Sequence, residues 1–572
     1  MHKKFFFIFI FILNITFAYE IKFHGVDSKE ILKKIKESAF LEKTPPKSIK
    51  ALRIRVEKNI PDIIDILHFF GYYDCKIMYQ LEKKLIANIY IELGTRYLLT
   101  TYEISIIGEK KPDISYKTIE IKIPSYITSK NLIDAKNRIL KYLNQNGYIL
   151  ASIKKHDIKV DMSEKKIEVF VEIDKGPLCH FGSITITGLK NIYPRYIYKK
   201  ISWKEGEIYS EKKISETEKR LLNTNLFTSV AITHSKNLDE ENLLPIKIRV
   251  TEAKHKTLCL GVSYATVDEY GALFGWTHRN IRRMGEILNM QADISKKAYT
   301  GIASYKKPDF LKFDQDLIVQ AYAIREKIRA YLAFTYGGDS KIYDKTFKKF
   351  NYSYGLRTEY INVIHSANNG KFYLVGFPFV LRYNNANHFL NPTKGYDIIY
   401  SITPFINTSH KKGGFTKQRI SISLYYPNIT ERLVFAIRMQ FGSIIGSDVY
   451  KIPMTKLFLG GSDDDLRGYR YKTVSPRNKN GEIIGGKSSI YITLEPRFRL
   501  SNTIGIVPFL DLGNIRLKEF PTFEGKWRKS YGIGLRYFTF FGPLRLDIAF
   551  PLDRYKKDDP KYRFYISIGQ TF

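Results

Sequence analysis

The sequence predicts α+β repeats followed by a transmembrane antiparallel β-barrel of about 16 strands. First, residues 564–572 alternate apolar side chains with small or polar ones and stop on an aromatic residue. This pattern suits a closing barrel strand with lipid on one face and the lumen on the other. Second, one pattern of strands and helices occurs three times within residues 19–255. Third, residues 256–572 consist of short alternating segments separated by turn residues, a length that fits about 16 tilted strands.

Residues 1–18 are predicted to be a signal peptide. Lys3 and Lys4 precede a short apolar run over residues 5–13, and Ala18 ends a small-x-small cleavage site. The run is too short to cross a bilayer as a helix, and no later stretch is long and apolar enough to do so. A retained N-terminal anchor is the alternative interpretation. A chain that is exported and spans a membrane with β-strands is expected in an outer membrane of the Gram-negative type.

Three units of similar length are predicted before the barrel, at residues 19–98, 99–176 and 177–255, and the barrel is predicted over residues 256–572. Each unit opens with a strand-like segment that ends in glycine, at a period of about 80 residues. Helical spacing follows, and a pair of strands closes each unit. The predicted order is therefore strand, helix, helix, strand, strand. Unrelated α+β modules are the alternative.

The net charge of +35 at pH 7 does not indicate a nucleic-acid-binding protein. The basic excess is spread along the chain and dominated by Lys, whereas proteins that read nucleic acid gather it into a patch. Outer-membrane lipids and lipopolysaccharide are anionic partners that suit this charge. Cys75, Cys179 and Cys259 are far apart and odd in number, so they define neither a disulfide framework nor a metal site. No cofactor and no enzymatic activity are predicted, because the histidines form no cluster with ligand spacing.

Residues 481–488 match the phosphate-binding pattern G-x-x-x-x-G-K-S. A working phosphate loop follows a buried strand and opens a helix whose N-terminus faces the phosphate. Here Pro476 and a polar run precede the match, and an alternating strand over residues 489–494 follows it. The missing context argues against nucleotide binding.

Residues 459–469 read LGGSDDDLRGY. The last four of them, Leu466, Arg467, Gly468 and Tyr469, closely resemble the end of the signature G-G-x-x-S-[VL]-R-G-[YF] of the BamA/TamA superfamily of outer-membrane assembly factors. In that family the motif lies on a long extracellular loop that folds back into the barrel lumen. The resemblance implies that the arginine is held there by acidic and aromatic groups of inner strands. An ordinary lumen arginine of a porin is the alternative.

Other segments resemble the same family. Glu495 and Asp511 stand on strands similar to the family's acidic inner strands, and Gly513 completes an F-x-D-x-G-like motif. One departure is Asp465, which stands where serine is common. The three N-terminal units resemble polypeptide-transport-associated (POTRA) domains, which offer a sheet edge to an extended client or partner.

Within the superfamily, three POTRA-like units and a short chain resemble the TamA branch, the translocation and assembly module subunit. The resemblance implies insertion or secretion of unfolded outer-membrane client proteins, including autotransporters. It also implies an inner-membrane-anchored, TamB-like partner, a barrel in the outer membrane and POTRA domains in the periplasm.

A weak seam between the first and last barrel strands is the implied route for clients. Gly261 lies on the first of these strands and Phe564 on the last. Gly569 has no side chain to pack and lets the last strand kink, which shortens its paired edge. Phe572 is expected on the lipid face at the membrane interface, as part of a targeting signal.

Two other functions remain open. A barrel of this kind also suits a protein that anchors a periplasmic bridge for phospholipid transport to the outer membrane. A two-partner secretion translocator is the third interpretation, although it would need a plug helix before the first unit, where Tyr19 begins a strand at once.

Overall fold

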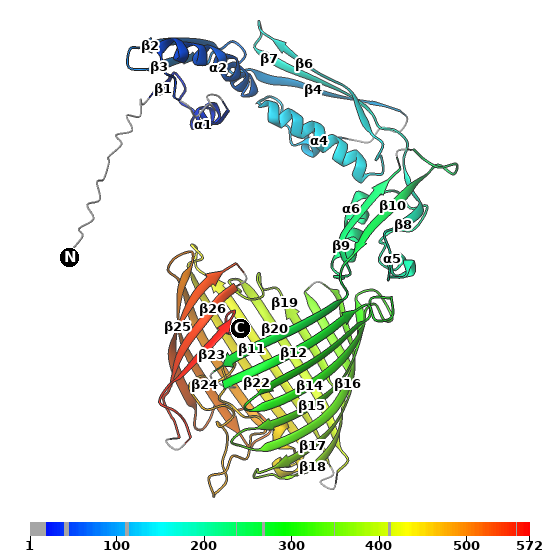
Figure 1. The fold of residues 1–572 in the computed structure, drawn as a ribbon, viewed down its shortest axis with the longest axis vertical. Helices are drawn as coiled ribbons and strands as arrows, with labels where there is room; N and C mark the ends of the chain where they lie inside the picture. The colour runs from blue at the N-terminus through cyan, green and yellow to red at the C-terminus, as the bar shows by residue number, and fades with distance from the viewer. Residues whose placement is uncertain are drawn as a thin grey trace, which may run out of the picture. The chain divides into compact units, whose positions relative to one another are not determined.

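The computed structural model describes residues 19–38, 45–108, 114–235, 237–265, 269–347, 349–409, 413–540, 542–555 and 558–572 (Figure 1). The predicted signal peptide, residues 1–18, lies outside the described residues. Contacts divide the chain into two compact units. The first runs to Gly188 and takes in Lys200–Asn223 and Ser229–Val250; the second comprises Leu189–Lys199, Thr224–Thr228 and Thr251–Phe572.

The first repeat contains a three-stranded sheet with two helices. Its elements are β1 (Glu20–His24), α1 (Lys29–Ser38), α2 (Ile49–Phe69), β2 (Lys76–Glu82) and β3 (Ile86–Glu92). The sheet order is β1-β3-β2, with β1 parallel and β2 antiparallel to β3. Ile35, Leu52 and Ile63 are fully buried and join the helices to the sheet in one apolar core. Helix α2 ends before Gly71, whose φ of 90° suits a left-handed C-cap.

The second repeat follows the same plan and adds one short strand. Its elements are β4 (Leu98–Ile107), α3 (Tyr116–Ile119), β5 (Ser125–Tyr126), α4 (Ser129–Gln145), β6 (Ser152–Asp161) and β7 (Lys166–Asp174), in the sheet order β5-β4-β7-β6. Thr128 and Asn131 form a capping box that fixes the start of α4.

The third repeat contains β8 (His180–Thr187), α5 (Pro194–Tyr198), α6 (Glu211–Leu222), β9 (Phe227–His234) and β10 (Leu243–Glu252), in the sheet order β8-β10-β9. The order of elements predicted from the sequence is therefore present in all three repeats, whereas the exact unit boundaries stay a prediction. None of the helices in the described residues is long and apolar enough to cross a membrane.

In the described residues of the second unit, 17 strands form one antiparallel sheet whose strand order follows the sequence. The strands are β11 (Lys256–Ala265), β12 (Glu269–Arg279), β13 (Ile287–Ser295), β14 (Ala298–Lys307), β15 (Gln315–Lys327), β16 (Leu332–Phe347), β17 (Phe350–Ile364), β18 (Gly370–Gly376), β19 (Phe379–Asn384), β20 (Gly395–Asn407), β21 (Gly413–Pro427), β22 (Leu433–Gly446), β23 (Ser488–Arg499), β24 (Ile504–Arg516), β25 (Arg528–Thr539), β26 (Gly542–Pro551) and β27 (Arg563–Ile568). Figure 1 shows the sheet curled into a barrel.

Strands β18 and β19 are two halves of one crossing. Both pair with β17 on one side and β20 on the other, and they are separated by Phe377 and Pro378. Proline has no backbone N–H to donate to a ladder, so the strand is interrupted there. The sheet therefore makes sixteen crossings, and the predicted fold class, with about 16 strands, is confirmed.

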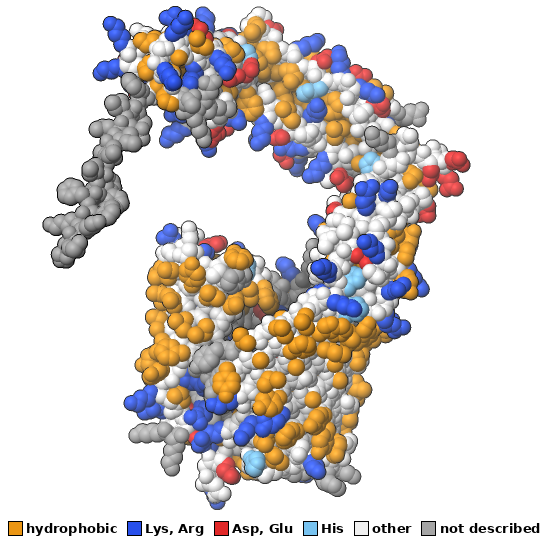
Figure 2. Space-filling view, in the orientation of Figure 1, with side chains coloured by type: hydrophobic (Ala, Val, Ile, Leu, Met, Phe, Trp, Pro, Cys, Tyr) orange, Lys and Arg blue, Asp and Glu red, His pale blue; other side chains and the backbone are white. Residues whose placement is uncertain are grey.

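Apolar and polar side chains alternate along the barrel strands, so they face opposite sides of the barrel wall. On β26, Leu544 and Leu546 are exposed on the outside, whereas Arg545 and Asp547 are buried on the lumen side. Figure 2 shows apolar side chains covering much of the outer surface of the barrel. Charged side chains are therefore collected in the interior, where they can pair with each other.

The sheet does not close by hydrogen bonds in the described part of the chain: no ladder joins β11 to β27. Strand β27 has six residues and pairs with β26 alone. We use the term seam for the junction between β11 and β27.

Candidate functional site: the internal loop and the seam

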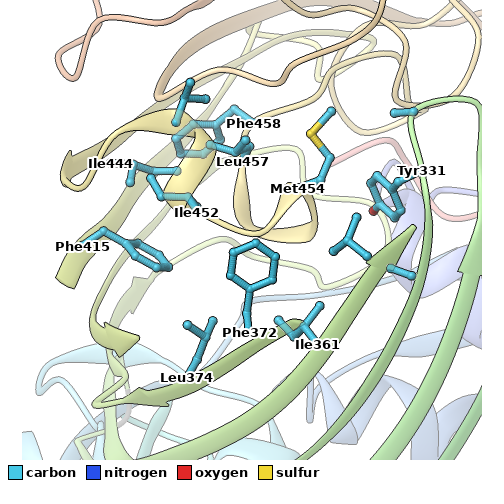
Figure 3. Packing of buried hydrophobic residues seen from close by; sticks show 14 of the residues in the cluster. Tyr331, Ile361, Phe372, Leu374, Phe415, Ile444, Ile452, Met454, Leu457 and Phe458 are labelled. Atoms are coloured by element: carbon cyan, nitrogen blue, oxygen red, sulfur yellow. The ribbon is translucent and has the colours of Figure 1, made fainter. Parts of the chain in front are cut away.

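A long loop, residues 447–487, connects β22 to β23 and packs inside the barrel on an apolar base. It contains two short helical turns, η1 (Val449–Lys451) and η2 (Met454–Lys456). Figure 3 shows Ile452, Met454 and Leu457 of this loop beside side chains of the barrel wall such as Phe372. All four of these side chains are buried. Burial of this apolar surface holds the first part of the loop in the lumen.

Hydrogen bonds and an ion pair fasten the same part of the loop to the wall. The side-chain nitrogen of Asn368 donates to the carbonyl oxygens of Val449 and Ile452, at 3.3 and 2.7 Å. The ammonium group of Lys456 pairs with the carboxylate of Glu359 on β17. These contacts satisfy polar groups that the apolar base would otherwise leave unpaired.

The tip of the loop is shaped by Asp465. One of its carboxylate oxygens accepts hydrogen bonds from the backbone nitrogens of Gly461 and Ser462, at 2.8 and 2.7 Å. Gly461 has a φ of 108°, a conformation that glycine adopts without strain. The aspartate that departs from the family signature therefore caps the turn that leads into the motif.

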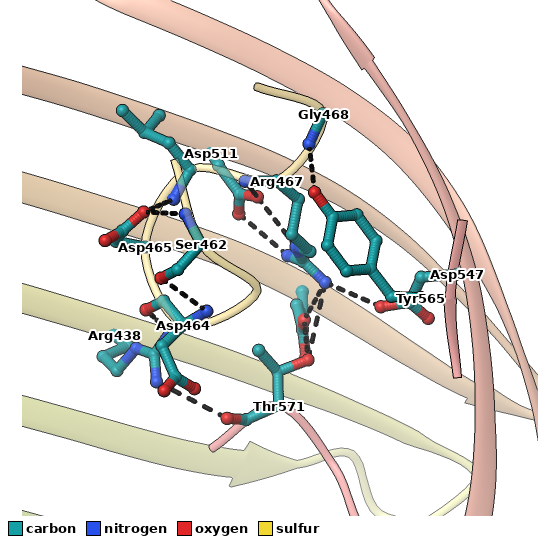
Figure 4. A network of polar contacts seen from close by, with 12 residues as sticks. Arg438, Ser462, Asp464, Asp465, Arg467, Gly468, Asp511, Asp547, Tyr565 and Thr571 are labelled. Atoms are coloured by element: carbon teal, nitrogen blue, oxygen red, sulfur yellow. Dashed lines mark hydrogen bonds and ion pairs between the residues drawn. The ribbon is translucent and has the colours of Figure 1, made fainter. Parts of the chain in front are cut away.

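Arg467 lies at the centre of a buried charge network (Figure 4). Its Nε and Nη2 donate to the two carboxylate oxygens of Asp511 on β24, each at 2.8 Å. Its Nη1 donates to Glu495 on β23 at 2.8 Å and to Asp547 on β26 at 3.0 Å. The guanidinium also lies 3.4 Å from the ring centroid of Phe509. Only 1% of the arginine is exposed, so this one side chain joins the loop to three strands.

Asp547 serves as a shared counter-ion. Besides Arg467, its carboxylate pairs with Arg536 and with Arg545, the latter at 2.9 Å. Glu495 is shared in the same way, because its second oxygen pairs with Arg497 at 3.0 Å. Three carboxylates and four arginines thus form one buried network in which every carboxylate has at least one guanidinium partner.

The residues beside Arg467 are also fitted to the wall. Leu466 packs where Gly513 has no side chain: a Cβ on Gly513 would lie 2.3 Å from a methyl carbon of Leu466. The hydroxyl of Tyr469 donates to the carbonyl oxygen of Lys529 at 2.7 Å. The backbone nitrogen of Gly468 donates to the hydroxyl of Tyr565 on β27 at 2.8 Å. The motif therefore touches the last strand as well as the inner strands.

Replacing Tyr565 with Phe is expected to loosen the docked loop by about 1–2 kcal/mol, because the buried amide of Gly468 loses its acceptor. Limited proteolysis of the loop, followed by mass spectrometry, measures this. Tyr562→Phe is the matched control, since Tyr562 precedes the same strand and is 51% exposed. Equal cleavage rates in the two variants would show that this hydrogen bond does not hold the loop.

The structure brings together the predicted motif, Leu466 to Tyr469, and the predicted partners Glu495, Asp511 and Gly513. Sequence reasoning missed Asp547, Tyr565 and Thr571 as partners of the motif. Asp547 and Tyr565 alternate with apolar residues in their segments, and this alternation was the available signal. The hydroxyl of Thr571 donates to Glu495 at 2.8 Å. The alternation of residues 564–572 put Thr571 on the same side as Tyr565 but did not identify Glu495 as its partner.

The predicted position of Phe572 on the lipid face is wrong, whereas its role in a targeting signal stays a prediction. Strand β27 ends at Ile568, and Gly569 with a φ of 95° turns the chain into the lumen. The ring of Phe572 lies 4.6 Å from the guanidinium of Arg438 and 5.0 Å from that of Arg497, and it stacks on Tyr425. Lumen arginines offer this ring cation–π contacts that the lipid face lacks.

The other predicted seam residues lie on the two strands that border the seam. Gly261 of β11 pairs with Leu273 of β12, and Phe564 of β27 pairs with Ile548 of β26 and is exposed on the outside. In the described residues no group of His, Cys, Asp or Glu is placed to hold a metal ion. The phosphate-loop match ends at Ser488, where a strand and not a helix begins, and its Lys487 pairs with Glu519 at 2.8 Å.

A barrel of sixteen crossings that follows strand-and-helix repeats and holds its own arginine-anchored loop defines a class of outer-membrane proteins with periplasmic domains. Comparison with known families agrees. The Omp85 superfamily domain matches residues 280–572, and a surface antigen variable number repeat, a POTRA domain, matches residues 179–253. The chain belongs to the Omp85 superfamily, with its barrel in the outer membrane and its POTRA domains in the periplasm.

Curated relatives include the outer membrane protein assembly factor BamA of Nitratidesulfovibrio vulgaris, 23% identical over 88% of this chain and 66% of the relative. BamA of Neisseria meningitidis serogroup B is 20% identical over 90% of this chain and 72% of the relative. The chain thus spans about two thirds of the length of these relatives. The crystal structure of BamA from Haemophilus ducreyi lacking POTRA domains 1–3 aligns with a TM-score of 0.72 and 18% identity, covering 82% of this chain and 99% of that one. The superfamily predicted from the sequence is confirmed, and the TamA branch stays a prediction.

Proposed function

We propose that this protein assembles client β-barrel proteins, autotransporters among them, into the outer membrane through the seam between β11 and β27. The observation that carries the proposal is the missing ladder between these strands in the described part of the chain. A strand with one unpaired edge can pair with another extended chain, because its backbone donors and acceptors remain available. The names of the relatives, outer membrane protein assembly factors, support the same activity.

The short last strand lowers the barrier to opening. Strand β27 is held to β26 over six residue pairs, whereas neighbouring pairs such as β25 and β26 share ten. Gly569 ends the strand, so the remaining residues contribute no ladder at the seam. A client strand therefore displaces few contacts when it enters.

The periplasmic repeats supply docking edges for partners. Each of their three sheets ends in an outer strand, β2, β6 and β9, with one neighbour in the described residues. We propose that a TamB-like, inner-membrane-anchored protein and unfolded clients add a strand to such an edge. The three repeats of this chain support its assignment to the TamA branch, for which a partner of this kind is expected.

A covalent lock across the seam is expected to abolish client assembly while the barrel stays folded. Cysteine is introduced at Ile566 of β27 and, in separate variants, at Leu258, Leu260 or Val262 of β11, in a chain whose three native cysteines are replaced by serine. The lock is closed by oxidation or a short bismaleimide. Folding of an unfolded barrel client by the chain in liposomes is followed by heat-dependent gel migration.

A Leu546→Cys/Ile566→Cys variant is the matched control, since these residues are paired between β26 and β27 and a link there leaves the seam free. Reduction should restore assembly in the seam variants. Full client assembly with the seam link demonstrably formed would rule out the proposed route.

A further inference from the structure

A cleft of about 760 Å³ lies beside the seam. It is at the end of the barrel opposite to Lys256, the residue at which the first barrel strand begins. Strands β13 and β15 end there and β27 begins there, so the cleft is on the extracellular side of an outer-membrane barrel. Among the described residues that line it, six have cationic side chains and none has a carboxylate. The cationic residues, here called the basic cleft, are Lys296, Lys297, Lys327, Arg329, Arg470 and Arg563. Figure 2 shows Lys and Arg side chains gathered near the lower end of the barrel.

Two carboxylates near the cleft pair with cations of the cleft or of its surroundings. Asp558 pairs with both Arg329 and Arg477, so one negative charge is shared between two guanidinium groups. Glu326 pairs with Lys472, which lies outside the lining. Lys296, Lys327, Arg329 and Arg470 are exposed, so these cations are accessible to an anionic ligand at the extracellular surface.

An apolar groove of about 430 Å³ adjoins the basic cleft along the seam. It is lined by Leu260 and Val262 of β11, which are 71% and 92% exposed, and by Phe274 and Ile294 of the next two strands. Ile294 stands two residues before Lys296, or about 7 Å along the strand. Phe564, Ile566 and Ile568 of β27 expose apolar side chains on the outer face of its strand. The seam thus offers cations at the membrane surface and an apolar wall directly below them.

We propose that the basic cleft binds the phosphate groups of a phosphorylated outer-leaflet glycolipid, whose acyl chains lie in the groove of Leu260 and Val262. Lys and Arg near a membrane surface attract anionic head groups, and Arg binds phosphate in a bidentate manner. The lipid occupies the two sides of the seam at its extracellular end. Binding is a property of the closed protein and does not depend on the assembly activity proposed above.

The test is binding of the phosphorylated glycolipid anchor of lipopolysaccharide to the full chain in detergent, measured by native mass spectrometry. Lys296→Gln/Lys327→Gln is expected to weaken binding about tenfold, since two surface cations are removed. Lys371→Gln/Lys479→Gln is the matched control, because both lysines are exposed in the same unit and neither lines the cleft. Lys296→Arg/Lys327→Arg should restore binding. Heat-dependent gel migration shows that each variant is folded.

Two further binding measurements identify the ligand. The same glycolipid without its phosphates is expected to bind at least about tenfold more weakly than the intact one. Inorganic phosphate should not displace the intact glycolipid, because it lacks the acyl chains that fill the groove. Equal binding by the Gln variant and its control, equal binding of the dephosphorylated lipid, or full displacement by inorganic phosphate would each overturn the proposal. Because no client is present, a failure of client assembly would leave these results unchanged.

Discussion

Arg467→Ala is expected to release the internal loop and lower the stability of the barrel by about 3–5 kcal/mol. The substitution removes the guanidinium that three buried carboxylates share, and Asp511 loses both of its hydrogen bonds to that side chain. A buried carboxylate without a cation is far more costly than the intact pair, because water cannot replace the partner. Unfolding in urea and the gel migration of unheated protein measure the effect.

Arg467→Lys should fall between the parent and Arg467→Ala, since an ammonium keeps the charge but cannot bind Asp511 with a planar fork. Lys479→Ala is the control, because it removes an exposed cation from the same loop. Parental stability and parental resistance of the loop to protease in Arg467→Ala would refute the anchoring role of this arginine.

Asp547→Ala is expected to lower the stability of the barrel by a similar amount, about 3–5 kcal/mol, because it removes a buried anion where Arg467→Ala removes a buried cation. Its carboxylate is shared by Arg467, Arg536 and Arg545, so its loss leaves three buried guanidinium groups close together. Repulsion between like charges is strong where water is excluded. Asp547→Asn keeps the shape of the side chain and separates the effect of charge from that of packing.

A double-mutant cycle tests whether Asp547 and Arg467 act together. Because the two side chains are in direct contact, the double variant Arg467→Ala/Asp547→Ala should lose less stability than the sum of the two single losses. Additive losses would show that the loop and strand β26 are stabilised independently.

Much of the site could be predicted from the sequence, because charges at alternate positions of a barrel strand must face the lumen. Asp547 and Tyr565 stand at such alternate positions, and the resemblance supplied Arg467, Glu495 and Asp511. What the sequence could not provide was the stagger of the strands, which decides that Asp547 reaches the same guanidinium as Asp511. Stagger depends on the hydrogen-bond register around the whole sheet.

Two local features escaped prediction for physical reasons. The alternation of the last residues is compatible with a straight strand, but Gly569, with its positive φ, turns the chain into the lumen, so both Thr571 and Phe572 lie inside the barrel. The interruption of the crossing between β17 and β20 depends on Pro378, which removes one donor without changing the apolar pattern. Backbone conformation at single residues, and not periodicity, decided both outcomes.

The strands differ greatly in length around the barrel, and this bears on the thickness of the surrounding membrane. Strand β16 has 16 residues, whereas β27 has six. At about 3.4 Å per residue, β27 spans roughly 20 Å before any tilt, against a hydrocarbon core of about 30 Å. Lipid next to β27 is therefore expected to thin to match it, while lipid beside β16 keeps its full depth. The barrel is therefore expected to impose a gradient of bilayer thickness, with the thinnest bilayer beside β27.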